Sequence, residues 1–267
     1  MRLSKRSRIL LRLAVAIALA FIYIPLIVIG IYAFNSSKIL EWPPPGFTTH
    51  WFSQAFKDEA AREAFVTSIK AGLIAGSIAL VLGTLAALAV ARHRFFGRET
   101  ISFLVILPIA LPGIVTGVAI SNTFTQVLNV PLSLFTVIVG HATFCIVVVY
   151  NNAVARLRRS SASFEEASMD LGADGWQTFR HVTLPNLSTA LVAGGLLAFA
   201  LSFDEIVVTL FTAGSQQTLP LWMYEQFKLP NQAPEANAVA VFVIALTALP
   251  VYFAQRLMRD TGGITGR

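Results

Sequence analysis

The sequence predicts an all-α membrane protein with six transmembrane helices. Of its 267 residues, 55% are hydrophobic and only 13% are charged, which is about half the charged fraction of a typical soluble domain. Six apolar segments reach the roughly 20 residues that a helix needs to cross the hydrocarbon core of a bilayer. Lys and Arg residues gather in alternate connections between these segments. These observations predict a single transmembrane domain over residues 1–267.

The six expected spans follow one another along nearly the whole chain. The first is longer than the apolar part of a cleavable signal peptide, and no small-residue cleavage site precedes Asn35, so it is interpreted as an uncleaved anchor. Pro25, Pro108, Pro112 and Pro250 should kink or interrupt the helices that contain them. The spans are expected at approximately 9–34, 65–91, 101–124, 134–153, 187–213 and 237–254.

The distribution of basic residues predicts how the chain is oriented. Five Lys and Arg residues lie in the segments expected on one side of the membrane or just inside it: Lys38, Lys57, Arg62, Lys70 and Lys228. The other fifteen lie on the opposite side, which the positive-inside rule makes cytoplasmic. Both termini and the connection at 156–184 are therefore expected in the cytoplasm. Topology explains the net charge of +6, and a nucleic-acid partner is unnecessary.

The connection between the fourth and fifth expected spans predicts two short helices. Ser163 and Glu166 have the spacing of a capping box, and Gly172 suits the left-handed position that follows a helix. Asp174 should cap a second helix, which should end at Pro185. The expected product is a helix–turn–helix elbow on the cytoplasmic face.

This elbow contains more apolar side chains than a solvated loop needs. Two interpretations are open: these side chains pack under their own helix bundle, or they form a docking site for another protein. The residues concerned are Phe164, Met169, Leu171, Trp176 and Phe179.

The same connection resembles the EAA loop of ABC importer permeases. That pattern is Glu-Ala-Ala, three residues, Gly, nine residues, an aliphatic residue, any residue, then Leu-Pro. The spacing here matches throughout, with Ser168 in place of the second Ala. The resemblance covers essentially the whole chain and implies the type I permease fold of ABC importers. It implies an ATPase-coupling role for Glu166, Ala167, Ser168, Gly172, Leu184 and Pro185.

The resemblance also implies a set of partners in the bacterial inner membrane. These are a second permease subunit, two cytoplasmic ATPase subunits and a periplasmic substrate-binding protein. The sequence agrees with this division of labour, because none of its five Lys residues follows a Gly as a P-loop requires. ATP and Mg²⁺ are thus expected on the ATPase, and no cofactor on this chain. One Cys and four scattered His residues offer no metal site, and no catalytic constellation indicates an enzyme.

Asp204 and Glu205 are adjacent acids inside the fifth expected span. An ionised residue at the centre of a membrane helix costs roughly 2.5 to 3.5 kcal/mol on a translocon scale, and the span contains no Lys or Arg to neutralise the pair. Two interpretations are open. In the first, one of the two acids, which one being left open, faces the pathway of a cationic substrate, while the other pairs with a neighbouring helix or caps a local break. In the second, the acids form a structural pair satisfied by the partner subunit or by backbone donors.

The segment from Ser202 to Ala213, followed by Thr218-Leu-Pro220, resembles the polyamine branch of these permeases, in particular its C-type subunit. This resemblance implies import of spermidine or putrescine. Aromatic faces at Phe203, Trp222 and Tyr224 could add cation–π contacts, although packing at the membrane interface is an equally simple role for them. Import of another organic cation or an amino-acid-like solute stays open, as does a secondary transporter driven by an ion gradient.

Overall fold

The computed structural model describes residues 4–262, with side chains described from 4 to 247. Regular structure in this part of the chain is helical, apart from an isolated bridge between Asn35 and Phe47. The chain divides into two compact units. One consists of residues 1–62 and 223–267, and the other of residues 63–222.

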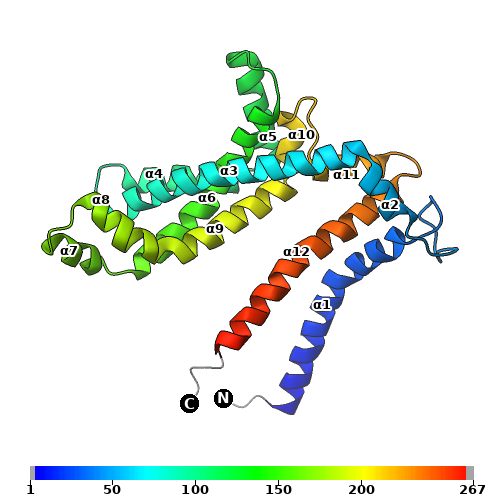
Figure 1. The fold of residues 1–267 in the computed structure, drawn as a ribbon, viewed down its shortest axis with the longest axis horizontal. Helices are drawn as coiled ribbons and strands as arrows, with labels where there is room; N and C mark the ends of the chain where they lie inside the picture. The colour runs from blue at the N-terminus through cyan, green and yellow to red at the C-terminus, as the bar shows by residue number, and fades with distance from the viewer. Residues whose placement is uncertain (1–3, 263–267) are drawn as a thin grey trace. The chain divides into compact units, whose positions relative to one another are not determined.

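The first unit pairs the two ends of the chain. Helix α1 (Lys5–Ala33) lies beside α12 (Ala233–Gly262), and α2 (His50–Lys57) also packs on α12 (Figure 1). Trp51 is buried here, and its indole Nε1 donates to the carbonyl oxygen of Asn35 at 2.7 Å. The Gln54 side chain of α2 donates to a carboxylate oxygen of Glu235 at 2.6 Å, which joins α2 to the start of α12.

The second unit contains the elbow and the pair of acids. Its long helices α3, α6 and α9 lie side by side (Figure 1). Small residues allow this, since a Cβ on Gly83 of α3 would lie only 2.9 Å from the carbonyl oxygen of Ile146 in α6. The first turn of α3 and the later part of α11 belong to the first unit. The helices are α3 (Glu59–Arg92), α4 (Arg98–Ala110), α5 (Gly113–Asn122), α6 (Leu134–Arg159), α7 (Ser163–Asp170), α8 (Gly175–Thr178), α9 (Leu184–Asp204), α10 (Val207–Thr212) and α11 (Leu219–Lys228).

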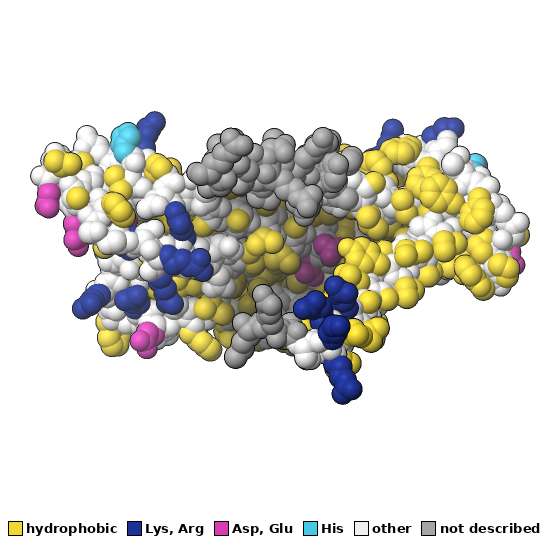
Figure 2. Space-filling view, turned by 90° about the horizontal axis from the view of Figure 1, so that it is seen from below, with side chains coloured by type: hydrophobic (Ala, Val, Ile, Leu, Met, Phe, Trp, Pro, Cys, Tyr) yellow, Lys and Arg dark blue, Asp and Glu magenta, His cyan; other side chains and the backbone are white. Residues whose placement is uncertain are grey.

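Four helices in the described residues are long and apolar enough to cross a membrane: α1, α3, α6 and the continuous helix from Gly175 to Asp204. Large apolar side chains stay exposed along α1, as expected for a surface that faces lipid. In the second unit, several Lys and Arg side chains gather toward the end that carries α7 and α8 (Figure 2).

The third expected span is broken rather than continuous. Helices α4 and α5, the latter extended by a π-helical turn at Thr123–Val127, meet at an angle of 103°. Leu111 has an extended backbone, with ψ 142°, which is the conformation that a following proline favours. The interruption expected at Pro112 is thus confirmed, whereas Pro25 and Pro108 lie inside continuous helices.

The sixth expected span, 237–254, begins inside α12. The part of α12 whose side chains the structure describes, residues 233–247, is apolar. The side chains beyond residue 247, including Pro250, lie outside those that the structure describes.

Candidate functional site

The first helix of the elbow ends in the left-handed turn that the sequence predicts. Gly172 has a φ of +91°, which only glycine adopts without strain. Its N–H donates to the carbonyl oxygen of Met169 at 2.9 Å, and the N–H of Ala173 donates to that of Ser168 at 3.2 Å. This pair of bonds is a Schellman motif, so the helix stop at Gly172 is confirmed.

The two predicted caps of the elbow have different outcomes. Asp174 accepts the N–H of Gln177 at 2.8 Å, and the Gln177 side chain accepts the N–H of Asp174 at 3.0 Å, which confirms the second cap. The first capping box is wrong, because Ser163 is already helical and its N–H donates to the hydroxyl of Ser161 at 3.2 Å. Glu166 is left exposed. The hydroxyl of Ser161, two positions earlier, accepts a helix N–H in place of the cap expected at Ser163.

The expectation that Pro185 ends the second helix is also wrong. The helix that begins at Gly175 continues to Asp204. A π-helical turn covers Phe179–Thr183, and its wider spacing lets the N–H of Leu184 donate to the carbonyl oxygen of Phe179. This widened turn lets the helix continue into Pro185, which has no N–H to donate and whose ring crowds the preceding turn of a regular helix.

The apolar side chains of the elbow are mostly exposed rather than packed under their own bundle. Leu171 is 90% exposed, Trp176 is 65% exposed and Phe164 is 61% exposed. The rings of Trp176 and Phe179 lie 5.6 Å apart and form a small aromatic surface. Ser168, the departure from the EAA pattern, shares a hydrogen bond of 3.1 Å with Thr178 and so joins the two helices of the elbow.

The residue that attaches the elbow to the helix bundle is not evident from the sequence. Glu165 pairs with Arg92 at the end of α3, with a shortest distance of 3.0 Å. It also accepts the hydroxyl of Thr183 at 3.2 Å. The interaction joins residues 73 positions apart, and no local pattern predicts such a pair.

The fifth expected span is interrupted at the two acids. Helix α9 ends at Asp204, Glu205 has an extended backbone with ψ 119°, and α10 begins at Val207. A carboxylate oxygen of Glu205 accepts the N–H of Val208 at 2.8 Å, which satisfies one of the free donors at the start of a helix. Asp204 is exposed and has no hydrogen-bond or ion-pair partner within the described residues.

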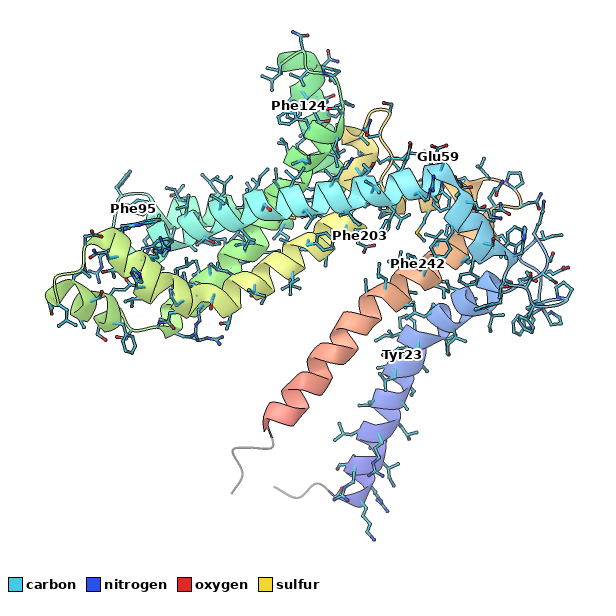
Figure 3. All side chains as sticks on the ribbon, in the orientation of Figure 1. Tyr23, Glu59, Phe95, Phe124, Phe203 and Phe242 are labelled. Carbon is cyan, nitrogen blue, oxygen red and sulfur yellow. The ribbon has the colours of Figure 1, made fainter. Side chains whose placement is uncertain are left out.

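The three aromatic residues named with the acids occupy different settings. Phe203 lies at the end of α9 (Figure 3), with its ring 6.1 Å from that of Phe65. Trp222 is 1% exposed, so its ring offers no open face in this chain. Tyr224 belongs to the other unit, where the ammonium of Lys228 lies 3.8 Å from the centre of its ring.

Comparison with known proteins now identifies the family of the chain. The profile of the binding-protein-dependent transport system inner membrane component family matches residues 79–260. The chain belongs to this family. It is therefore a multi-pass permease subunit of an ABC importer.

Relatives of this permease transport polyamines. It is 32% identical to the putrescine transport system permease protein PotI of Escherichia coli K12, over 89% of this chain and 86% of PotI. It is 33% identical to the spermidine/putrescine transport system permease protein PotC of the same strain, over 92% of this chain and 93% of PotC. A solved bacterial ABC transporter involved in alginate import shares the fold, with a TM-score of 0.70, 17% identity and coverage of 95% and 99% of the two chains.

Proposed function

We propose that this permease carries polyamines of the spermidine and putrescine class across the bacterial inner membrane. In the proposed complex, it pairs with a second permease subunit and with two cytoplasmic ATPase subunits that use ATP and Mg²⁺. A periplasmic binding protein delivers the substrate. The likeness to PotI and PotC over most of the chain supports the substrate class.

The basic residues support an orientation with both termini and the elbow in the cytoplasm. Arg156, Arg158 and Arg180 lie in the elbow segment of the sequence, and cytoplasmic connections are the ones that collect such residues. Residues 1–267 together would form one transmembrane domain.

The elbow supports coupling to an ATPase. Its exposed side chains include both apolar groups, such as Leu171 and Trp176, and the Glu166 carboxylate. A contiguous apolar surface rimmed by polar groups is typical of a protein interface. In the proposed complex, this surface fills a groove of the ATPase, so that movement of the ATPase reaches α9 through the continuous helix from Gly175.

One observation carries the proposal for a cationic substrate: Asp204 is exposed at the end of a broken helix and has no partner among the described residues. The C-terminal end of a helix carries a partial negative charge, and the carboxylate of Asp204 adds a full one. Broken helices whose C-terminal ends attract cations form substrate and ion sites in transporters. The ring of Phe203, the residue before Asp204, would lie at the edge of the pathway.

Uptake by the complete complex in proteoliposomes tests this proposal. With the binding protein outside and ATP available to the ATPase, labelled spermidine and putrescine should accumulate. Each unlabelled polyamine should compete, whereas a neutral amino acid should not. ATP-dependent uptake of an amino acid without uptake of either polyamine would instead favour the alternative solute class. Uptake that follows an ion gradient without ATP would favour a secondary transporter.

A further inference from the structure

A buried histidine connects the two sides of the break beside Asp204. His141 of α6 is 0% exposed. Its Nδ1 lies 2.7 Å from the hydroxyl of Ser202, near the end of α9, and its Nε2 lies 2.8 Å from the hydroxyl of Thr209 in α10. One side chain therefore contacts both helices that meet at the break.

The surrounding hydrogen bonds settle the direction of these two contacts. The hydroxyl of Thr209 donates its only proton to the carbonyl oxygen of Glu205 at 2.8 Å. Thr209 can then only accept from the imidazole, so Nε2 of His141 carries the proton. Nδ1 of this neutral tautomer accepts from Ser202. The result is one directed chain of hydrogen bonds, from Ser202 through His141 and Thr209 to the backbone of Glu205.

Other residues of α6 hold the same two helices but contact only one of them each. The hydroxyl of Thr136 donates to the carbonyl oxygen of Thr212 in α10 at 2.6 Å. The thiol of Cys145 donates to that of Ala198 in α9 at 3.2 Å. Gly140 lets α10 approach, since a Cβ there would lie 2.9 Å from Val208. His141 lies between these contacts, at the level of the break.

We infer that His141 is a positioning residue for the substrate pathway. By fixing the backbone at Glu205, it holds the carboxylate of Glu205 on the N–H of Val208 and leaves Asp204 free to meet a cation. His141 itself does not touch the substrate. This inference rests on the proposed function for the role of Asp204, but not for the geometry of the break.

Two substitutions separate the halves of this bridge. The terminal amide of Gln reaches the position of the histidine Nε2, whereas that of Asn reaches only the position of Nδ1. His141→Gln should therefore keep the bond to Thr209, and His141→Asn should keep only the bond to Ser202. Thr209→Val removes the receiving hydroxyl and should resemble His141→Asn. Thr143→Val is the matched control, because Thr143 lies on α6 but its hydroxyl bonds only within that helix, to Gly140.

Hydrogen exchange in the assembled complex, measured by mass spectrometry, reports on the break without any substrate. A peptide that covers 204–212 should exchange about three- to tenfold faster in His141→Asn and Thr209→Val, the range expected for loss of one hydrogen bond. His141→Gln and Thr143→Val should exchange like the wild type. The ratio of apparent spermidine to putrescine affinity should fall in the first two variants and stay unchanged in the other two.

Several results would overturn the inference. Equal exchange in His141→Asn and His141→Gln, whether both normal or both fast, would show that the imidazole only fills space. A normal result for Thr209→Val would contradict the bridge even if neither His141 variant assembles. If the wild-type complex does not transport polyamines but hydrogen exchange still differs between His141→Asn and His141→Gln as expected, the proposed substrate is wrong and the bridge through His141 is supported.

Discussion

The guanidinium of Arg92 lies 3.0 Å from the carboxylate of Glu165, which ties the last residue of α3 to the first helix of the elbow. Both side chains are largely shielded from water, at 17% and 19% exposed. Arg92 also donates to the carbonyl oxygen of Leu157 in α6 at 3.4 Å. The pair thus joins α3, α6 and α7, and it is placed to pass a movement of the elbow to the helix bundle.

Reversing one charge of this pair should weaken coupling. Arg92→Glu or Glu165→Arg places like charges together, and loss of a charged hydrogen bond costs about 1.5–3 kcal/mol. Each single variant should transport less substrate per ATP and melt at a lower temperature, as measured on the purified complex. The double reversal should regain part of both. Arg94→Glu is the control, since Arg94 is exposed; a double variant no better than either single one would contradict a direct role for the pair.

Leu171 should contribute to docking of the ATPase without contributing to the fold of the permease itself. It is 90% exposed, so Leu171→Asp removes no internal packing. In the proposed complex the ATPase would bury this aspartate without a partner for its charge, which costs several kcal/mol. The variant should insert and melt normally but fail to co-purify with the ATPase or to stimulate ATP hydrolysis. Leu171→Met keeps an apolar group and should retain both; co-purification of Leu171→Asp at wild-type yield would place the interface elsewhere.

Gly172 should tolerate substitution according to backbone preference alone. An added Cβ would meet nothing within 4 Å there, but a left-handed conformation costs an L-residue roughly 1–2 kcal/mol. Yield of assembled complex should fall in the order Gly172→Asn, Gly172→Ala and Gly172→Val, because β-branched residues tolerate this conformation worst. Gly175→Val is the control, since Gly175 also has open space but no positive φ. Equal yields for the three Gly172 variants would remove the turn argument.

Features set by local chemistry could be predicted from the sequence. Segment length and hydropathy gave the class of fold, and the turn at Gly172 and the Asp174 cap depend on residues within three or four positions. Competition between neighbours explains the errors. The hydroxyl of Ser161, rather than that of Ser163, accepts an N–H at the start of the helix. A π-helical turn lets the second helix continue through Pro185.

Features set by tertiary contacts could not be predicted. Glu165 and Arg92 are 73 positions apart, and His141 reaches Thr209 across 68 positions. A single sequence shows no period or spacing that connects such residues. For the same reason, the sequence leaves open which of the two adjacent acids faces the pathway, because their different surroundings come from helix packing.

Asp204 and Glu205 should respond differently to loss of charge, because Asp204 is exposed with no partner in the part of the chain that the structure describes, while Glu205 caps α10. Asp204→Asn should assemble normally but transport less, with a larger loss for trivalent spermidine than for divalent putrescine, since Coulomb attraction scales with charge. Glu205→Gln should instead lower the complex yield or the melting temperature, because weakening a helix cap lowers stability by about 0.5–2 kcal/mol. It should leave the preference between substrates unchanged. Uptake in vesicles, normalised to assembled complex, separates the two effects. Normal uptake of both polyamines by both single variants and by the double variant would exclude a role for this pair in handling cations.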